Sequence, residues 1–134
     1  MSDPVGSTHH VGILVRDLDQ AEAFATAVLG LPVVSRIASE EHRMRAAFLA
    51  CGPTLIELVE FSDPDLVATR LGDRVAAIDH VALEVEDVEE AARGLGAHGV
   101  ETVAQDPLEL PSGRTHFTKP ETSMGVIWQL LELK

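Results

Sequence analysis

Two histidines, one glutamate and one glutamine occupy matching positions in the two halves of this 134-residue chain. His10 and His80 are 70 residues apart, and an apolar run follows each of them. Glu57 stands 47 residues after His10, inside an apolar strand-like stretch. Gln129 stands 49 residues after His80, in a similar stretch. A glutamate in an apolar strand is costly unless it is paired or binds a cation. Two imidazoles, a carboxylate and an amide oxygen suit a divalent ion with room for two more ligands.

The matching positions come from an internal repeat. The segment His10–Ala21 aligns with His80–Ala91 at a constant offset of 70 residues. The identical pairs are His10/His80, Val11/Val81, Val15/Val85, Asp17/Asp87 and Ala21/Ala91. Most other pairs match apolar with apolar or polar with polar, which chance does not readily give. Two related modules in one chain explain the pattern.

Each module is predicted to have the element order βαβββ, and the fold class is therefore α+β. An apolar strand leads into an aspartate that can cap the following helix, Asp17 in one module and Asp87 in the other. The helices are expected at 18–29 and 88–98, each ended by a glycine. The remaining strands are expected at 32–37, 43–50 and 54–61 in the first module and at 100–104, 115–118 and 125–133 in the second.

The chain length predicts a single domain, 1–134, made of modules 8–61 and 78–133. The linker 62–77 opens with Ser-Asp-Pro-Asp, which can cap one short helix. Segment 107–113 has turn residues and no periodicity, and we expect a loop near the mouth of a site.

Strand periodicity predicts which way His10 faces. The face of the first strand that carries Val11, Ile13 and Val15 is β-branched, and we expect it to lie under the helix. His10 is on the other face, and the repeat gives His80 the equivalent place. The four remaining histidines lack such a pairing and are expected at the surface or in loops: His9, His42, His98 and His116.

Charge and composition exclude several classes of function. Lys and Arg number 10 against 22 Asp and Glu, a formal net charge of −12, so we expect no nucleic-acid or membrane partner. Cys51 is the sole cysteine, which excludes an intrachain disulfide and a thiol-based metal site. The segment Met1–His10 lacks the basic residues and apolar run of a signal peptide, and no stretch reaches the roughly 20 apolar residues of a membrane span. We expect a soluble, cytoplasmic protein with a small-molecule substrate.

Several segments resemble the vicinal oxygen chelate superfamily of glyoxalases, extradiol dioxygenases and antibiotic-resistance proteins. They are His-Val-Gly-Ile-Leu-Val-Arg-Asp-Leu at 10–18, Val-Leu-Gly-Leu at 28–31, Ile-Glu-Leu at 56–58 and Asp-His-Val-Ala-Leu-Glu-Val at 79–85. The resemblance covers about residues 8–133. It implies that the two modules form a curved mixed sheet, a half-barrel, around a divalent metal ion. The ligands that it implies are His10, Glu57, His80 and Gln129.

Within the superfamily the chain is most similar to the methylmalonyl-CoA epimerase family. Glu41-His42, followed by a short strand, resembles that family's Glu-His-Gly-Val segment, whose glutamate is an acid/base; it maps to Glu41. Thr118-Lys-Pro and Gly125-Val-Ile-Trp-Gln-Leu resemble its His-Pro-Lys and Gly-Val-Leu-Ile-Glu-Leu segments. The chain departs from the family in having Gln129 for a carboxylate, Arg43 for a glycine and Phe24-Ala25 for Phe-Tyr.

The resemblance implies a metal-dependent epimerase or isomerase that abstracts a proton next to a carbonyl. The substrate would be methylmalonyl-CoA or a related acyl-CoA or 1,3-dicarbonyl compound, and the metal Co, Mn, Ni, Zn or Mg. Glu41 would take the proton, and Glu57 would replace the second catalytic carboxylate. Candidate cations for a CoA ester, or else ordinary solvated charges, are Arg43, Arg45, Arg114 and Lys119.

Other functions on the same scaffold stay open at this point. One is a glyoxalase-type lyase or a glutathione- or thiol-dependent transferase. A ring-cleaving Fe(II) dioxygenase is disfavoured, because it needs a carboxylate where this chain has Gln129. A non-catalytic protein that sequesters a drug or senses a ligand is disfavoured by the metal-ligand residues. Sheet edges left by the modules predict a homodimer.

Overall fold

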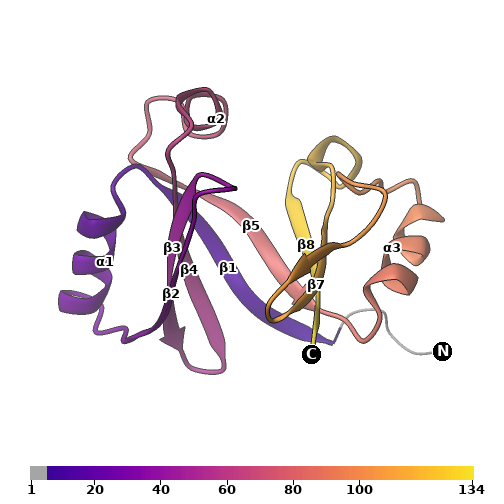
Figure 1. Ribbon diagram of the computed structural model, residues 1–134, viewed down its shortest axis with the longest axis horizontal. Coiled ribbons are helices and arrows are strands. Elements are labelled where there is room, and N and C mark those ends of the chain that lie inside the picture. Colours follow the sequence, from indigo (N-terminus) through magenta and orange to yellow (C-terminus); the bar gives the residue numbers. More distant parts are fainter. Residues whose placement is uncertain (1–5) are drawn as a thin grey trace. The chain divides into compact units, whose positions relative to one another are not determined.

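The computed structural model describes residues 6–134, which fall into two compact units (Figure 1). One unit is formed by residues 10–79, and the other by residues 80–134 together with residues 6–9. Each of the strands β1 and β5 contributes residues to both units. The sequence predicts that Met1–His10 is not a signal peptide. Residues 1–5 of this segment lie outside the described residues.

The elements have the predicted order, βαβββ in each module. The first module contains β1 (Ser7–Val15), α1 (Leu18–Ala27), β2 (Val33–Ser39), β3 (Met44–Cys51) and β4 (Thr54–Phe61). Helix α2 (Pro64–Arg70) follows it. The second module contains β5 (Ala76–Glu84), α3 (Val88–Gly96), β6 (Leu108–Leu110), β7 (Gly113–Phe117), a 3-10 turn η1 (Pro120–Thr122) and β8 (Ile127–Leu133). The predicted α+β class is confirmed.

The two modules pair their strands in the same way. The strand order is β2-β3-β4-β1 in the first module and β5-β8-β7-β6 in the second. Neighbouring strands are antiparallel except for one pair in each module, β1 with β4 and β5 with β8, which are parallel. In both modules, therefore, the first and last strands run side by side in the same direction.

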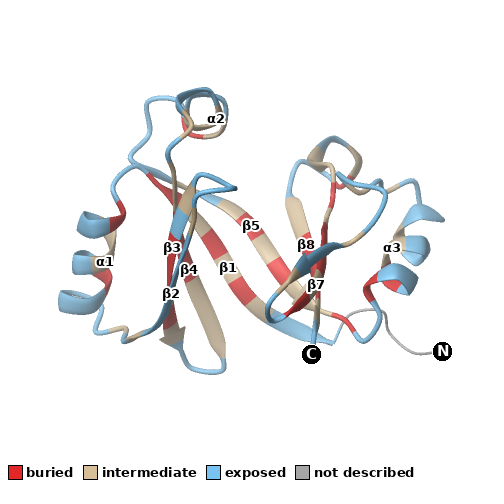
Figure 2. Cartoon of the chain, viewed as in Figure 1, coloured by how far each residue is buried: buried red, intermediate tan, exposed pale blue. Residues whose placement is uncertain are grey.

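Helices α1 and α3 each cover one face of the strands of their own module, whose buried residues are red in Figure 2. Apolar residues pack beneath each of these two helices. In the 10–79 unit, Val15 and the partly buried Ile13 pack with Leu18 and Ala25 at α1. Under α3, Val85 and Leu130 pack with helix residues in the same manner. The β-branched face of β1 therefore lies under the helix as predicted, and His10 is on the opposite face.

The helices begin at the predicted caps. Asp17 Oδ1 accepts a hydrogen bond from Gln20 N at 3.1 Å, and Asp87 Oδ1 accepts from the first-turn amides of Glu89 and Glu90 at 3.0 and 3.1 Å. The helix predicted in the linker is α2, capped by Asp63. Satisfying these otherwise unpaired N–H groups fixes where each helix starts.

The second module differs from the prediction in the position of its second strand. The segment predicted as strand 100–104 forms only an isolated bridge between Thr102 and Thr118, while β6 occupies part of the predicted loop 107–113. Thr102 Oγ1 donates to Ala104 O at 2.7 Å. Such a local side-chain bond competes with strand pairing and bends the chain.

No helix among residues 6–134 has the length and apolarity needed to span a bilayer.

Gly113 is expected to tolerate no side chain. A Cβ at this position would lie 1.9 Å from Glu132 O, a backbone atom of the paired strand β8, and its φ is +155°. Gly113→Ala should therefore destabilise the protein by about 3 kcal/mol or more, measured by urea denaturation. Gly52→Ala is the control, because its Cβ would meet nothing within 4 Å and only its φ of +62° is unfavourable. It should cost only about 1 kcal/mol, and equal losses for the two variants would contradict the prediction.

Candidate metal centre

His10 on β1 and Glu57 on β4 lie next to each other in the 10–79 unit. The parallel register makes Gly12 the backbone partner of Glu57 and Leu55 the partner of His10. His10 Nε2 lies 3.4 Å from Glu57 Oε1, and the two residues are only 3% and 6% exposed. The strand pairing alone therefore brings an imidazole nitrogen and a carboxylate oxygen together away from solvent.

The ring of Phe48 on β3 packs against this pair. It is the antiparallel partner of Glu57, and its ring meets the His10 ring edge to face, with centroids 5.3 Å apart and planes at 87°. On the other side of Glu57, Gly12 has no side chain to crowd the carboxylate. The aromatic contact limits the ways in which the imidazole can turn.

His80 on β5 and Gln129 on β8 repeat this arrangement in the other unit. Ala82 is the parallel partner of Gln129, as Gly12 is of Glu57, and Phe117 is its antiparallel partner. The His80 and Phe117 rings also meet edge to face, with centroids 5.9 Å apart and planes at 86°. Both His80 and Gln129 are buried, at 6% exposure each. Each module therefore carries one buried histidine and one buried oxygen donor on its pair of parallel strands.

The chemistry of these side chains fits a divalent metal ion. His10 and Glu57 in one unit, and His80 in the other, are residues of the types that can hold one. Burial of a carboxylate in a strand as apolar as β4 is costly unless a cation or hydrogen-bond donor compensates it. Neutral imidazole nitrogens and carboxylate oxygens are ligands for Zn, Co, Mn and Ni. The predicted ligand set of His10, Glu57, His80 and Gln129 stays a prediction.

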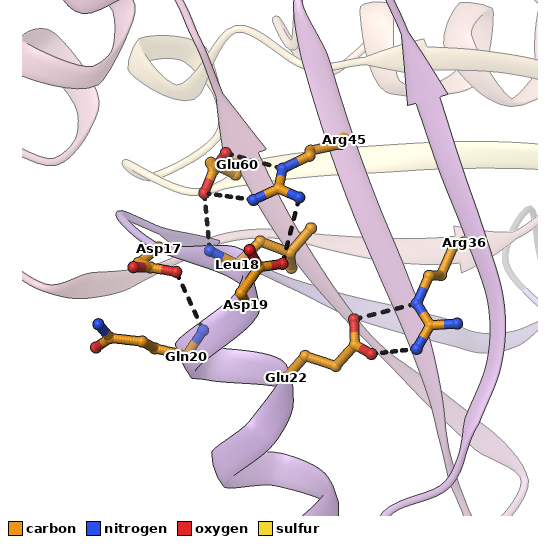
Figure 3. A network of polar contacts seen from close by, with 8 residues as sticks. All are labelled: Asp17, Leu18, Asp19, Gln20, Glu22, Arg36, Arg45 and Glu60. Atoms are coloured by element: carbon orange, nitrogen blue, oxygen red, sulfur yellow. Dashed lines mark hydrogen bonds and ion pairs between the residues drawn. The ribbon is translucent and has the colours of Figure 1, made fainter.

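Arg45 and Arg114, predicted as substrate-binding cations, each hold a carboxylate near the start of a helix. Arg45 Nε donates to Glu60 Oε1 at 3.0 Å, and its Nη1 lies 3.3 Å from Asp19 Oδ1 (Figure 3). Arg114 Nη2 donates to Glu132 Oε1 at 3.0 Å, and its Nη1 donates to Glu89 Oε1 at 2.7 Å. The two arginines thus have matched structural partners, and their role toward a substrate stays a prediction.

Glu41, Arg43 and Lys119 are at the surface of their units. Glu41 is exposed in the turn between β2 and β3. Arg43 ends this turn with a φ of 50°, and its Nη1 lies 3.8 Å from Asp63 Oδ2. With Arg45 it lines a hollow of about 430 Å³. Lys119 Nζ lies 3.3 Å from Glu101 Oε1.

Sequence reasoning placed His116 wrongly. It was expected at the surface or in a loop, but it lies in β7 and is 4% exposed. Burial lowers the pKa of His116, so its neutral form is favoured. Phe117 is the counterpart of Phe48, so Ala47, which packs under α1, is the counterpart of His116. That alignment within the repeat was the available signal.

Residues 9–117 match the model of the Glyoxalase/Bleomycin resistance protein/Dioxygenase superfamily. The chain belongs to this superfamily. The resemblance found in the sequence is therefore confirmed, including the likeness to methylmalonyl-CoA epimerases described next.

Several relatives of this superfamily member are epimerases by name. The mitochondrial methylmalonyl-CoA epimerase of Bos taurus is 26% identical over 129 residues, which are 94% of this chain and 74% of the relative. The 2-epi-5-epi-valiolone epimerase of an Actinomyces species is 30% identical over 122 residues, 80% of this chain and 67% of the relative. The chain is thus epimerase-like in sequence.

Solved structures of methylmalonyl-CoA epimerases have the same fold as this superfamily member. The enzyme from Mycobacterium tuberculosis superposes with a TM-score of 0.89 and 28% identity, over 100% of this chain and 92% of that one. A variant of the Streptomyces coelicolor enzyme, in complex with 2-nitronate-propionyl-CoA, has a TM-score of 0.86 and 26% identity over 96% and 98% of the chains. The predicted fold is confirmed.

Glu60→Gln is expected to destabilise the protein at neutral pH and to have less effect in acid. The hydrogen bond from Arg45 lowers the pKa of Glu60 from its ordinary value of 4.5, so the folded state favours the charged carboxylate. Its contribution to stability is therefore present above pH 4.5 and is lost as the pH falls through the lower folded pKa. Urea denaturation of both proteins at about pH 7 and about pH 3 measures this. A difference that is equal at the two pH values would contradict it.

Proposed function

We propose that the protein is a metal-dependent epimerase that moves a proton on a carbon next to a carbonyl group. One observation carries this proposal: the same pairing of a buried histidine with a buried oxygen donor occurs on the parallel strands of both modules. The similarity to named epimerases supports the reaction type. A binding protein without catalysis would have no need for this buried, ion-accepting donor set.

We propose that His10, Glu57, His80 and Gln129 bind one divalent ion, which is Co, Mn, Ni, Zn or Mg. The donor chemistry of the two buried histidines and the buried Glu57 supports this. So does the position of the histidines, because each is the first residue after a point where the chain passes from one unit to the other. When bound, the ion would polarise the substrate carbonyl and stabilise the negative charge of an enolate.

Two glutamates of the chain are assigned to the proton transfers. Glu41 takes the α-proton, and the C–H electron pair moves into the carbonyl system. Glu57, protonated before this step, then donates its proton to the opposite face of the carbon, which inverts the centre. Glu41 afterwards loses its proton to solvent, and Glu57 regains one from solvent. Gln129 has no ionisable group, so a carboxylate in the other module replaces the one that the resembled family has on its last strand.

The two glutamates of this proposal lie at different levels of the sheet. Glu57 lies in the middle of β4, opposite Phe48. Met44, the first residue of β3, is four residues from Phe48, which corresponds to about 13 Å at the usual rise of a strand. The turn with Glu41 lies beyond Met44. A substrate held between these levels of the sheet would meet one carboxylate on each side. In this proposal the exposed side chain of Glu41 reaches inward from the strand end.

The substrate that we propose is methylmalonyl-CoA or a related acyl-CoA. A solved methylmalonyl-CoA epimerase with 26% identity to this chain is a complex with methylmalonyl-CoA. Arg43 and Lys119 are the cations with the weaker ion pairs, at 3.8 and 3.3 Å, and we assign them first to the CoA phosphates. Arg45 and Arg114 could assist only by leaving their carboxylate partners.

A second candidate is an epimerase for a carbonyl compound that is not a thioester. The Actinomyces relative named for 2-epi-5-epi-valiolone favours it, being the more identical of the two relatives compared above. The lyase and transferase alternatives have no named relative among these. A homodimer, a cytoplasmic location and a single domain with modules 8–61 and 78–133 stay predictions.

Glu57→Gln is expected to abolish epimerisation while the protein still binds metal. The amide keeps an oxygen donor in the same place but cannot donate or accept the catalytic proton. Metal analysis of the purified variant and a coupled assay with methylmalonyl-CoA give the two readouts. Glu22→Gln, which alters an ion pair with Arg36 on the helix side, is the matched control and should keep full activity. Full activity of Glu57→Gln would overturn its role as a base.

Exchange of the substrate α-proton in deuterated water separates the candidates. We expect exchange with methylmalonyl-CoA in the wild type and at least a hundredfold slower exchange in Glu41→Gln, the range usual for loss of a general base. Exchange only with a cyclic ketone would favour the second candidate. A wild-type protein that binds no divalent metal would overturn the metal-dependent reaction altogether.

A further inference from the structure

In each module, the two donors stand on strands whose register no hairpin fixes. His10 and Glu57 are on the parallel strands β1 and β4, and His80 and Gln129 are on β5 and β8. Strands of a parallel pair are joined by a long crossover, so no tight turn determines which residues lie opposite each other. Because side chains alternate between faces, a slip of one residue would turn a donor to the wrong face. Some other contact must hold the register.

The first module has such a contact just beyond its donors. Glu60 follows Glu57 by three residues on β4, and its Oε2 accepts a hydrogen bond from Leu18 N at 2.8 Å. Leu18 is the first residue of α1 and follows the end of β1 by three residues. The bond therefore ties the carboxyl end of the strand with Glu57 to the carboxyl end of the strand with His10.

The second module has the same contact. Glu132 follows Gln129 by three residues on β8, and its Oε1 accepts from Val88 N at 3.0 Å. Val88 is the first residue of α3, three residues beyond Val85, whose own amide donates to Leu131 O at 3.0 Å. The strands with His80 and Gln129 are thus tied at the same end and at the same distance from the donors.

An arginine on the adjacent antiparallel strand orients each of these carboxylates. Arg45 on β3 is the backbone partner of Glu60, and Arg114 on β7 is the backbone partner of Glu132. Each guanidinium contacts both oxygens of its glutamate, at 3.0 and 3.4 Å for Arg45 and at 3.0 and 3.3 Å for Arg114. A two-point contact fixes the plane of the carboxylate as well as its charge.

Each of these arginines also contacts an acidic residue of the neighbouring helix. Arg45 also bonds Asp19, and Arg114 also bonds Glu89, the second residue of the respective helix. The sequence offsets agree with the repeat: 69 residues for the arginines, 72 for the glutamates and 70 for the helix residues. An incidental surface ion pair would not be expected twice with the same partners, because such pairs contribute little by themselves.

We infer that Glu60 with Arg45, and Glu132 with Arg114, are positioning residues that hold the parallel strands in the register that the donors require. We call each such set a register clamp. It consists of the glutamate, its arginine and the helix amide that donates to the glutamate. The clamps lie on the helix side of the strands, and the donors are on the other side, so the clamps act through the backbone. Their effect on metal binding rests on the proposed function, whereas their effect on the strands does not.

The first test measures metal affinity. Glu60→Ala should weaken the binding of Co²⁺ by about tenfold or more, the lower end of what loss of an outer positioning contact costs. Glu22→Ala is the control, since it removes another carboxylate–arginine pair from α1, with Arg36, and leaves both register clamps intact (Figure 3). The affinity of Glu22→Ala for Co²⁺ should stay within about twofold of the wild-type affinity. That change is smaller than the one expected from loss of a positioning contact. Equal weakening by both variants would overturn the inference.

The second test needs no metal. Amide hydrogen exchange of the metal-free proteins should show faster exchange for residues 11–14 of β1 and 56–58 of β4 in Glu60→Ala than in Glu22→Ala. If the wild type binds none of Co²⁺, Mn²⁺, Ni²⁺, Zn²⁺ and Mg²⁺ but this difference is found, the proposed function fails and the register role stands. If the difference is missing, the register role fails, whether or not metal binds.

Two further variants keep the test informative if Glu60→Ala does not fold. Glu60→Gln loses the charge that Arg45 contacts but keeps an oxygen for Leu18 N, and its exchange rates and Co²⁺ affinity should lie between those of the wild type and Glu60→Ala. Glu132→Ala should have the same effects on β5 and β8, with Glu90→Ala, an exposed carboxylate of α3, as its control. Values equal to those of the controls in both modules would overturn the inference.

Discussion

The burial of Glu57 against His10 is the constraint on which the rest of the site depends. A carboxylate within a strand whose neighbours pack under a helix must have compensation, and an imidazole nitrogen 3.4 Å away gives part of it. The parallel pairing of β1 and β4 makes that proximity possible. The same pairing of β5 and β8 sets Gln129 beside His80, but an amide there requires no counter-charge. The two halves thus share geometry and differ in charge, and this difference distinguishes the chain from the family pattern that it otherwise resembles.

Much of this could be predicted because the repeat carries both the elements and the donors. A strand, a capping aspartate and an apolar helix recur at one offset, so each module supports the interpretation of the other. The face of His10 followed from alternation along β1, and the packing of Ile13 and Val15 under α1 agrees with it. Glu57 was recognisable because a charged residue in an apolar strand is energetically unusual.

The errors came from residues whose role depends on distant partners. His116 looks like a surface histidine unless the repeat is extended to Ala47, and burial beneath α3 decides its state. The segment at residues 100–104 has strand-forming residues, but the bond of Thr102 to Ala104 O ends regular pairing. Arg45 and Arg114 were considered as cations for a ligand or as ordinary solvated charges, because no short-range pattern reveals that each has a glutamate directly across the strand pair.

The hairpin between β3 and β4 has one more practical property. Cys51 is exposed at the end of β3, and the full sequence contains no second thiol. A spin label or fluorophore attached by maleimide chemistry would therefore mark a single, known point of the 10–79 unit without any engineered cysteine. The natural chain is thus ready for spectroscopic distance measurements from this one point, at the hairpin between β3 and β4.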